Sequence, residues 1–477
     1  MIHPNRAHRR ARRVLTSYGA GLCAAFAFQS ARSETLDEAL ALAYRTNPQL
    51  LAARAGLRAT DETVAAARAN WRPSLTLTGT AGRESTTQTV TGAGNSPAQT
   101  LPLSTSTANS WAATVTQPIY RGGQTKAQVA QALLTVDAGR AQLETTEAAI
   151  LFQVVSSYFG CLLDEQLLAL TTEGEGLLRQ ELAAVESELR LAVATAPDRL
   201  QVESQLSSAT AARLQARGVL QASQDTYSHI VGHAPDQLTL PTLRPSLPAS
   251  REEALHLAAT TSPTVVAAEA QRDAGAKAID AATGKLRPQV SLVGSYSRYS
   301  VPPVDGVSQG KLNDRTIELE VTFPLYDGGA TYAEARQTKQ QFEQLRQSAD
   351  EAQLASVQLT GQAWDNLQTE RDILPELTRA ASAAEEAYDG IRKQQVLGLK
   401  TITDVLVAEQ TLIQARIART TAQYSAIVAE FALAEQLGML SGADLKLKVP
   451  LYDATEHFKE VQYKWIGLGS GTHDSVR

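Results

Sequence analysis

The chain repeats itself, and this repetition constrains its fold more than any other feature of the sequence. The stretch QPIYRGGQTKAQVAQAL, which begins at Gln117, returns as FPLYDGGATYAEARQTK from Phe323. Similarity at a fixed offset along much of a chain is the signature of a tandem duplication. We therefore divide the chain into a first copy at residues 34–247, a second copy at 248–440 and a C-terminal extension at 441–477.

Past the glycine pairs, the two copies keep one register. Asp198 aligns with Asp404, and Glu203 aligns with Glu409. Upstream of the glycine pairs the register differs by nine residues, because the first copy has the longer insert between its RP and GG landmarks. Each position in one copy therefore has a defined counterpart in the other.

Residues 1–33 are predicted to be a cleaved export signal. A cluster of arginines precedes an apolar run over residues 14–28, and small residues lead to a cleavage site near Ser33, which is the pattern of a signal peptide. Cys23 raises the alternative of a lipoprotein. That alternative is disfavoured, because leucine stands before the cysteine where a small residue is needed.

Charge and cysteine content narrow the class of protein. The formal net charge is −6, and residues 1–33 contain six arginines and no acidic residue, so the mature chain is more acidic still. Nucleic acid is not expected as a partner, because binding its phosphates requires a cationic surface. Only Cys161 remains after cleavage, so no intramolecular disulfide is expected.

The clearest strand signal is RTIELEVTF in the second copy. Ile317, Leu319 and Val321 fall on one face of a strand, while Glu318 and Glu320 fall on the other. This alternation suits a sheet with one face in lipid and the other in water. We therefore predict that Glu318 and Glu320 face the lumen of a channel.

Each copy contains two such segments, which predicts two β-hairpins. The hairpins are expected at residues 74–120 and 289–326, with polar loops at roughly 84–109 and 301–313. Four strands are too few to close a barrel, since the smallest barrels have about eight. Several chains must therefore combine their strands.

Each hairpin is followed by a long run with few helix-breaking residues. Residues 124 to 190 as one helix would extend about 100 Å at 1.5 Å per residue, and the expected helical hairpins cover 124–231 and 330–438, with Pro375 as a kink. The fold class is therefore a mixture of long antiparallel helices and membrane-spanning strands. No mature segment has 18 consecutive apolar residues, so a helical membrane span is not expected.

The glycine pairs stand where each strand gives way to a helix. We predict that they are hinges rather than phosphate-binding loops, because neither pair belongs to a GxGxxG or GxxxxGK[ST] pattern. The hinge residues are Gly122, Gly123, Gly328 and Gly329.

These residues resemble the TolC-like outer membrane efflux and secretion channels. The resemblance covers nearly all of the mature chain and rests on QPIYRGG, FPLYDGG and, above all, GLKTITDVLVAEQTLIQAR from Gly398. It implies a homotrimer whose strands close a barrel in the outer membrane lipid and whose helices form a tunnel through the periplasm. It also implies a periplasmic adaptor protein, an inner-membrane ABC exporter or proton-driven pump, and no cofactor.

The C-terminal extension sharpens the resemblance. The stretch VPLYDATEHFKEVQYKW from Val449 is similar to the tail of the type I secretion branch. We therefore expect type I protein secretion, with small-molecule or drug efflux as the alternative.

The resemblance also implies contacts at the turns of the helical hairpins. In the family an apolar turn meets the adaptor, and here that turn corresponds to Val396, Leu397, Gly398 and Leu399. The first copy has Ala192 where the second has Gly398, so tighter contact is expected at the second turn. The alternative is that Gly398 only permits the turn.

A periplasmic gate is expected just beyond these turns. The resemblance implies a ring of Asp404, with Lys400 in place of an arginine that ties neighbouring helices and Asp198 matching the acidic member of that tie. A second acidic ring of the family is missing, because this chain has Val407 there. The alternative is that both aspartates are helix-start carboxylates favoured by the helix dipole.

Enzymatic interpretations have little support. His229 and His233 are four residues apart and could form a metal pair, but no accompanying glutamate motif is present, and a polar helix end is the favoured interpretation. A scaffold of coiled coils without transport is also disfavoured, because it would need no strand with carboxylates opposite an apolar face.

Overall fold

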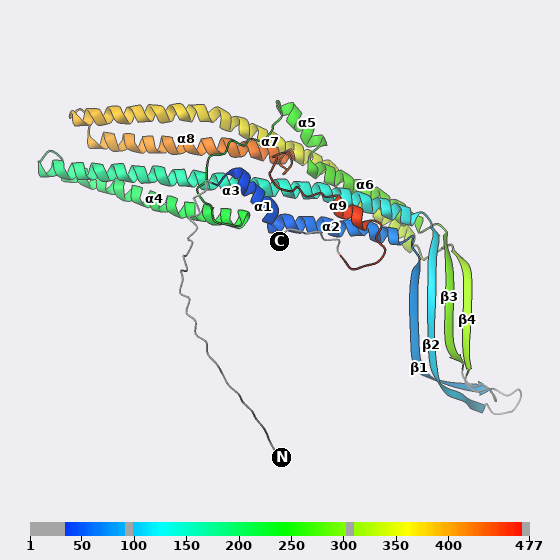
Figure 1. Ribbon diagram of the computed structural model, residues 1–477. Coiled ribbons are helices and arrows are strands. Elements are labelled where there is room, and N and C mark those ends of the chain that lie inside the picture. The colour runs from blue at the N-terminus through cyan, green and yellow to red at the C-terminus, as the bar shows by residue number, and fades with distance from the viewer. Residues whose placement is uncertain (1–33, 91–98, 302–309, 470–477) are drawn as a thin grey trace, which may run out of the picture.

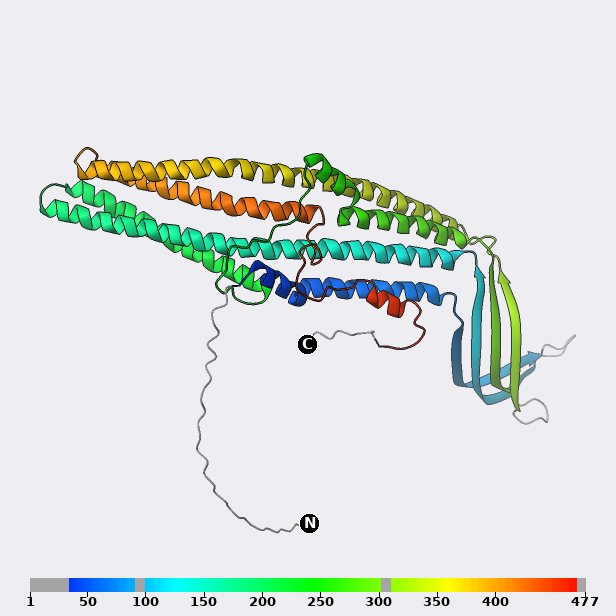
Figure 2. The ribbon, with the colours of Figure 1, turned by 45° about the horizontal axis from the view of Figure 1, so that its top comes forward.

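The computed structural model describes residues 34–90, 99–301 and 310–469. The predicted export signal and Cys23 lie outside the described residues. Within them the molecule is elongated, with long helices at one end and four strands at the other (Figure 1). The view in Figure 2 shows that the strands turn away from the axis of the helices. The predicted fold class, duplicated long helices joined to a small antiparallel sheet, is confirmed.

The same order of elements occurs twice. The first copy contains α1 (Leu36–Thr46), α2 (Pro48–Ala69), β1 (Ser74–Val90), β2 (Gln99–Arg121), α3 (Gln124–Arg190) and α4 (Ala196–Val231). The second contains α5 (Arg251–Thr260), α6 (Pro263–Gly284), β3 (Gln289–Val301), β4 (Gly310–Thr322), α7 (Ala330–Val396) and α8 (Ile402–Gln436). A short helix, α9 (Glu456–Val461), follows in the C-terminal extension.

Capping residues and prolines fix where the helices begin. The side chain of Asn47 accepts hydrogen bonds from the backbone N–H groups of Gln49 and Leu50, at 2.9 and 3.3 Å. Pro48 follows in the first turn of α2. Its lack of a backbone N–H has no cost there, because N–H groups of the first turn have no partner within the helix. By contrast, α7 continues through Pro375.

The four strands form one antiparallel sheet in the order β1-β2-β3-β4, so β1 and β4 are its edges. The strands are longer than predicted: β1 reaches Val90 and β2 begins at Gln99, within the range expected to be loop. The segment is rich in threonine, whose branched side chain favours extended backbone. Antiparallel pairing, which continues to Val90 opposite Gln99, satisfies its backbone groups.

The second hairpin is shorter than predicted. β4 ends at Thr322, so Phe323 to Tyr326 are not part of a strand. Their counterparts in the first copy are paired with β3 up to Arg121, opposite Gln289. β3 begins at Gln289, which pairs with Thr322, so no strand remains for the later residues to pair with.

Helix α3 runs through the main hydrophobic core. Tyr158 and Phe159 are essentially inaccessible there, together with Leu36 and Leu40 of α1 and Phe431 of α8. Among the described residues, α3 is also the one helix that is long and apolar enough to cross a membrane by length and composition, although it has no run of 18 consecutive apolar residues. Much of its apolar stretch, 56%, is buried inside the chain, as is typical of a core helix.

The C-terminal extension folds back along the first copy. The backbone N–H of Tyr452 donates to the Tyr44 hydroxyl at 3.1 Å, and His457 Nδ1 lies 3.1 Å from the buried Asp61 carboxylate. Farther along, Arg72 donates to the backbone oxygen of Lys464 at 2.6 Å. The described part of the extension, residues 441–469, is therefore a strap over α1 and α2 that reaches the start of β1.

Candidate functional site at the helical tips

Two short turns close the helical hairpins at the end of the molecule opposite to the strands (Figures 1 and 2). Ala192 joins α3 to α4 with φ of 59°, and Gly398 joins α7 to α8 with φ of 73°. Both residues are therefore left-handed, a conformation that costs a residue with a Cβ about 1–2 kcal/mol. The two turns therefore have the same backbone conformation, but this conformation is less favourable for Ala192 than for Gly398.

Apolar side chains are exposed at both turns. In the second turn Val396, Leu397 and Leu399 are 78%, 73% and 72% exposed. In the first turn Leu191 and Val193 are 76% and 74% exposed. The structure thus offers an apolar surface at each tip and no difference in exposure that would favour the second.

Asp404 lies in the first turn of α8 and forms a capping box with Thr401. Its Oδ2 accepts from the backbone N–H and the hydroxyl of Thr401, both at 2.9 Å, while the backbone N–H of Asp404 donates to Thr401 Oγ1 at 3.3 Å. The backbone hydrogen bond, followed by that of the hydroxyl, lowers the pKa of Asp404. The carboxylate is thus held in its charged form at the helix start.

Asp198 repeats this arrangement in the first turn of α4. Its Oδ2 accepts from the backbone N–H of Thr195 at 2.9 Å and from the hydroxyl at 2.6 Å, and the hydroxyl bond is the main cause of its lowered pKa. The helix-start role weighed for both aspartates is therefore present in the structure. It leaves the second oxygen, Oδ1, of each aspartate outside the capping box.

Lys400 contacts Asp404 rather than Asp198. Its Nζ lies 3.6 Å from Asp404 Oδ1, and both side chains are about two-fifths exposed, at 41% and 37%. Within one chain, the tie between neighbouring helices that the resemblance implies is thus not formed by these residues. The structure brings Lys400 and Asp404 together and leaves Asp198 at the other tip.

Two polar contacts also join the hairpins, and no pattern in the sequence indicates them. Thr403 Oγ1 donates to Gln201 Oε1 at 3.2 Å, joining α8 to α4. Arg416 of α8 donates to Glu173 of α3 at 2.9 Å and to Glu385 of α7 at 2.8 Å. The spacing of Arg416 from its partners carries no signal, whereas the capping boxes could have been found from the patterns TAPD and TITD.

The predicted hinges all have a left-handed backbone. The φ values of Gly122 and Gly123 are 62° and 87°, and those of Gly328 and Gly329 are 71° and 88°. Each pair lies directly before a long helix, α3 or α7. Only glycine adopts this conformation in successive residues at little cost, which explains why both copies have the pair.

The strand register separates the two faces of the sheet. Ile317 and Val321 of β4 lie opposite Gly294 and Val290 of β3, and Glu318 lies opposite Val293. Since side chains alternate along a strand, Glu318 and Glu320 share the face that is opposite to the exposed apolar residues Ile317, Leu319 and Val321. The geometry is compatible with a lipid-facing side and a polar side.

Comparisons with known proteins agree with this architecture. The family described as outer membrane efflux protein matches residues 16–233 and 254–439. The chain is 32% identical to the outer membrane efflux protein BepC of Brucella suis biovar 1 (strain 1330), over 92% of this chain and 93% of that protein. It is 23% identical to the alkaline protease secretion protein AprF of Pseudomonas aeruginosa, over 69% of this chain and 67% of that protein.

A solved structure shows the same fold. The Campylobacter jejuni CmeC outer membrane channel superposes with a TM-score of 0.73 at 13% identity, covering 90% of this chain and 89% of that one. The predicted resemblance to TolC-like channels is thereby confirmed. The chain belongs to the outer membrane efflux protein family, whose members are transport channels of the outer membrane.

Proposed function

We propose that three copies of this chain form one export channel through the outer membrane and the periplasm. The observation that carries this proposal is the four-stranded sheet with two unpaired edges, β1 and β4, and an exposed apolar face. Hydrocarbon tolerates no unpaired backbone edge. Three such sheets would close a barrel of about twelve strands, a size common among outer membrane barrels.

The helices support the same assembly. α4 exposes Leu214 and Val219, at 54% and 47%, and α7 exposes Leu354 and Leu359, at 67% and 48%. Contact with another chain would remove these apolar side chains from water, which is favourable. In the proposed trimer, α4 and α7 make the contacts between neighbouring chains, and Glu318 and Glu320 face the lumen.

We propose protein cargo delivered by a type I secretion system as the main function. Support comes from the C-terminal strap, which resembles the tail of the secretion branch, and from the similarity to AprF. An inner-membrane ABC exporter and a periplasmic adaptor would be the partners. The adaptor would bind the exposed apolar residues at the tips, around Gly398 and Ala192.

Small-molecule efflux is the second candidate. The similarity to BepC, at 32% identity over nearly the whole of both chains, favours it. The inner-membrane partner would then be a proton-driven pump. In both cases the proposed function is transport and not catalysis.

Deletion of the gene separates the two candidates. For protein secretion, we expect one or more proteins to disappear from the culture medium while susceptibility to toxic compounds is unchanged. For efflux, we expect the susceptibility to rise and the secreted proteins to remain. Complementation with the intact gene is the control, and a deletion that alters neither property contradicts both proposals.

Assembly is tested separately by sedimentation of the detergent-solubilised protein. We expect a mass of three chains. A stable, folded monomer would contradict the trimer, whichever cargo is exported.

A further inference from the structure

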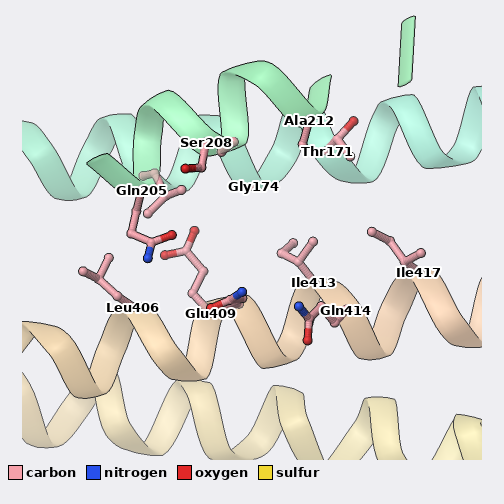
Figure 3. A pocket seen from close by; sticks show the side chains of 13 residues that line it. Thr171, Gly174, Gln205, Ser208, Ala212, Leu406, Glu409, Ile413, Gln414 and Ile417 are labelled. Carbon is pink, nitrogen blue, oxygen red and sulfur yellow. The ribbon is translucent and has the colours of Figure 1, made fainter. Parts of the chain in front are cut away.

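A cavity lies between the two copies, close to the helical tips. It is lined by α8 on one side and by α3 and α4 on the other, is partly open to solvent, and has a volume of about 270 Å³ (Figure 3). Drug-sized ligands occupy pockets of about 300–1,000 Å³, so this cavity suits a smaller molecule. Its walls are mainly apolar, from Leu178 of α3 and Leu406, Ile413 and Ile417 of α8.

One carboxylate enters this apolar cavity. Glu409 of α8 is only 4% exposed, and Figure 3 shows its side chain extending from α8 toward Gln205 and Ser208 of α4. Its Oε1 is buried and has no hydrogen-bond partner among the described residues. Burying a carboxylate without a hydrogen-bond partner lowers the stability of the folded protein. The Oε1 atom can therefore accept a hydrogen bond from a bound ligand.

The charged groups near the cavity do not supply that donor. Burial and, to a smaller extent, the nearby Glu181 of α3 raise the pKa of Glu409 to about 7, although Arg392 of α7 acts in the opposite direction. The cation of α4 nearest to this region, Arg213, is bound to Glu175, which also accepts from Arg179 and Thr210 at 2.8 Å. Glu175 is therefore saturated, while Glu409 is not.

Comparison with the first copy shows that Glu409 lacks a cationic partner on its own helix. Its counterpart in the first copy, Glu203, is 50% exposed and pairs with Arg199 at 3.0 Å. The position that corresponds to Arg199 in the second copy is Val405, which is 1% exposed. The second copy thus has the same carboxylate with valine in the place of the cation, and its carboxylate lies in a cavity.

We propose that this cavity binds a small organic monocation, such as a primary alkylammonium, through Glu409. The ammonium group would donate to the carboxylate and to the amide oxygens of Gln205, Gln410 or Gln414, while the alkyl body lies against the leucine and isoleucine walls. A divalent metal is a poorer fit, since the described residues contain no group of three histidine, cysteine or acidic side chains. The proposed binding site is separate from the proposed channel function. All its lining residues belong to one chain, so it does not require the assembled channel.

The test is calorimetric titration of the purified, detergent-solubilised protein with n-hexylammonium chloride at pH 8. At this pH Glu409 is mainly ionised. We expect saturable binding that Glu409→Gln weakens by about tenfold or more, the value of one charge-assisted hydrogen bond. The matched control is Glu203→Gln, which removes the equivalent exposed carboxylate and is expected to leave binding unchanged.

Two further measurements separate charge recognition from filling of an apolar space. n-Hexanol has the same alkyl body without the charge, and we expect it to bind at least tenfold more weakly. Ala212→Phe, which fills the cavity from α4, should abolish binding even if Glu409 is intact. Equal binding of hexanol and hexylammonium, or equal binding by the wild type and Glu409→Gln, would overturn the proposal.

Discussion

Helices α3 and α7 occupy equivalent places in the duplication and have the same length, 67 residues, yet they are packed very differently. α3 buries large side chains such as Tyr158 and Phe159 in the main core. The residues that α7 buries are mostly small, among them Ala335, Ala349 and Gly361. The two helices thus share one backbone arrangement, while the large buried side chains are concentrated on α3 and α7 contributes few of them.

The hinges offer the strongest way to test this asymmetry. A Cβ on Gly122 would lie 2.1 Å from the backbone oxygen of Gly284, whereas nothing lies within 4 Å of a Cβ on Gly328. We expect Gly122→Ala to destabilise the protein by more than about 4 kcal/mol, and Gly328→Ala by about 1–2 kcal/mol, the cost of the left-handed backbone alone. The measurement is chemical unfolding in detergent, and equal losses for the two variants would contradict the asymmetry.

At Glu409 the asymmetry is reversed, because here the second copy buries what the first exposes. Its pKa is raised to about 7 from an ordinary value of 4.5. Between pH 4.5 and about pH 7, the folded state therefore binds more protons at Glu409 than the unfolded state does. Its contribution to stability is therefore complete below pH 4.5 and is lost as pH rises to about 7, by about 3 kcal/mol.

Glu409→Gln should remove this part of the pH dependence, and Glu203→Gln should not. Unfolding of each variant at pH 5 and at pH 8 measures the difference. Glu435, whose pKa burial also raises to about 7, remains in both variants and supplies a residual slope. A Glu409→Gln protein with the wild-type slope would contradict the burial of this carboxylate.

The main core is tested at Tyr158, whose counterpart in the second copy is Trp364. The Tyr158 hydroxyl lies 2.6 Å from the backbone oxygen of Thr239 and accepts from the Thr239 N–H at 3.1 Å. We expect Tyr158→Phe to cost about 2 kcal/mol, because buried backbone groups lose their partner. Trp364 is only partly buried at a smaller cluster, so Trp364→Phe should cost less than about 1.5 kcal/mol. Thermal unfolding that ranks these variants in the opposite order would refute the comparison.

Substitutions at the tips should change the free energy of unfolding least, and the change should have opposite signs in the two copies. Ala192 and Gly398 share a left-handed backbone, so Ala192→Gly should stabilise the protein by about 1 kcal/mol and Gly398→Ala should destabilise it by about the same amount. Denaturation midpoints of the two variants and of the double exchange provide the measurement. Changes of the same sign in both variants would show that the turns are not equivalent.

The parts of the fold that the sequence indicated depend on local patterns. Alternation at Ile317 to Val321 and the glycine pairs before α3 and α7 are signals within a few residues, and the structure has a strand at the first and left-handed backbone at the second. The serine- and threonine-rich ends of β1 and β2 lack such alternation. Their pairing depends on the partner strand, and they were expected to be loops.

The candidate site was less accessible to sequence analysis. Asp404 and Asp198 could be located at the helix starts, and their capping partners follow from spacing. The bridge from Arg416 to Glu173 and Glu385 joins three helices, and its partners lie 243 and 31 residues away in the sequence, so no local pattern indicates it. Glu203 and Glu409 are identical residues at equivalent positions, and only the packing of the two copies makes one exposed and the other buried.

The C-terminal strap has a consequence for the order of events during folding. The main core contains Leu36 and Leu40, near the first described residue, together with Leu440, Leu445 and Leu447 in the last tenth of the chain. It therefore cannot be completed until almost the whole polypeptide has crossed the inner membrane. Contacts between such distant residues form slowly, so we expect the core to be completed late in folding and a chain truncated before the strap to lack a complete core.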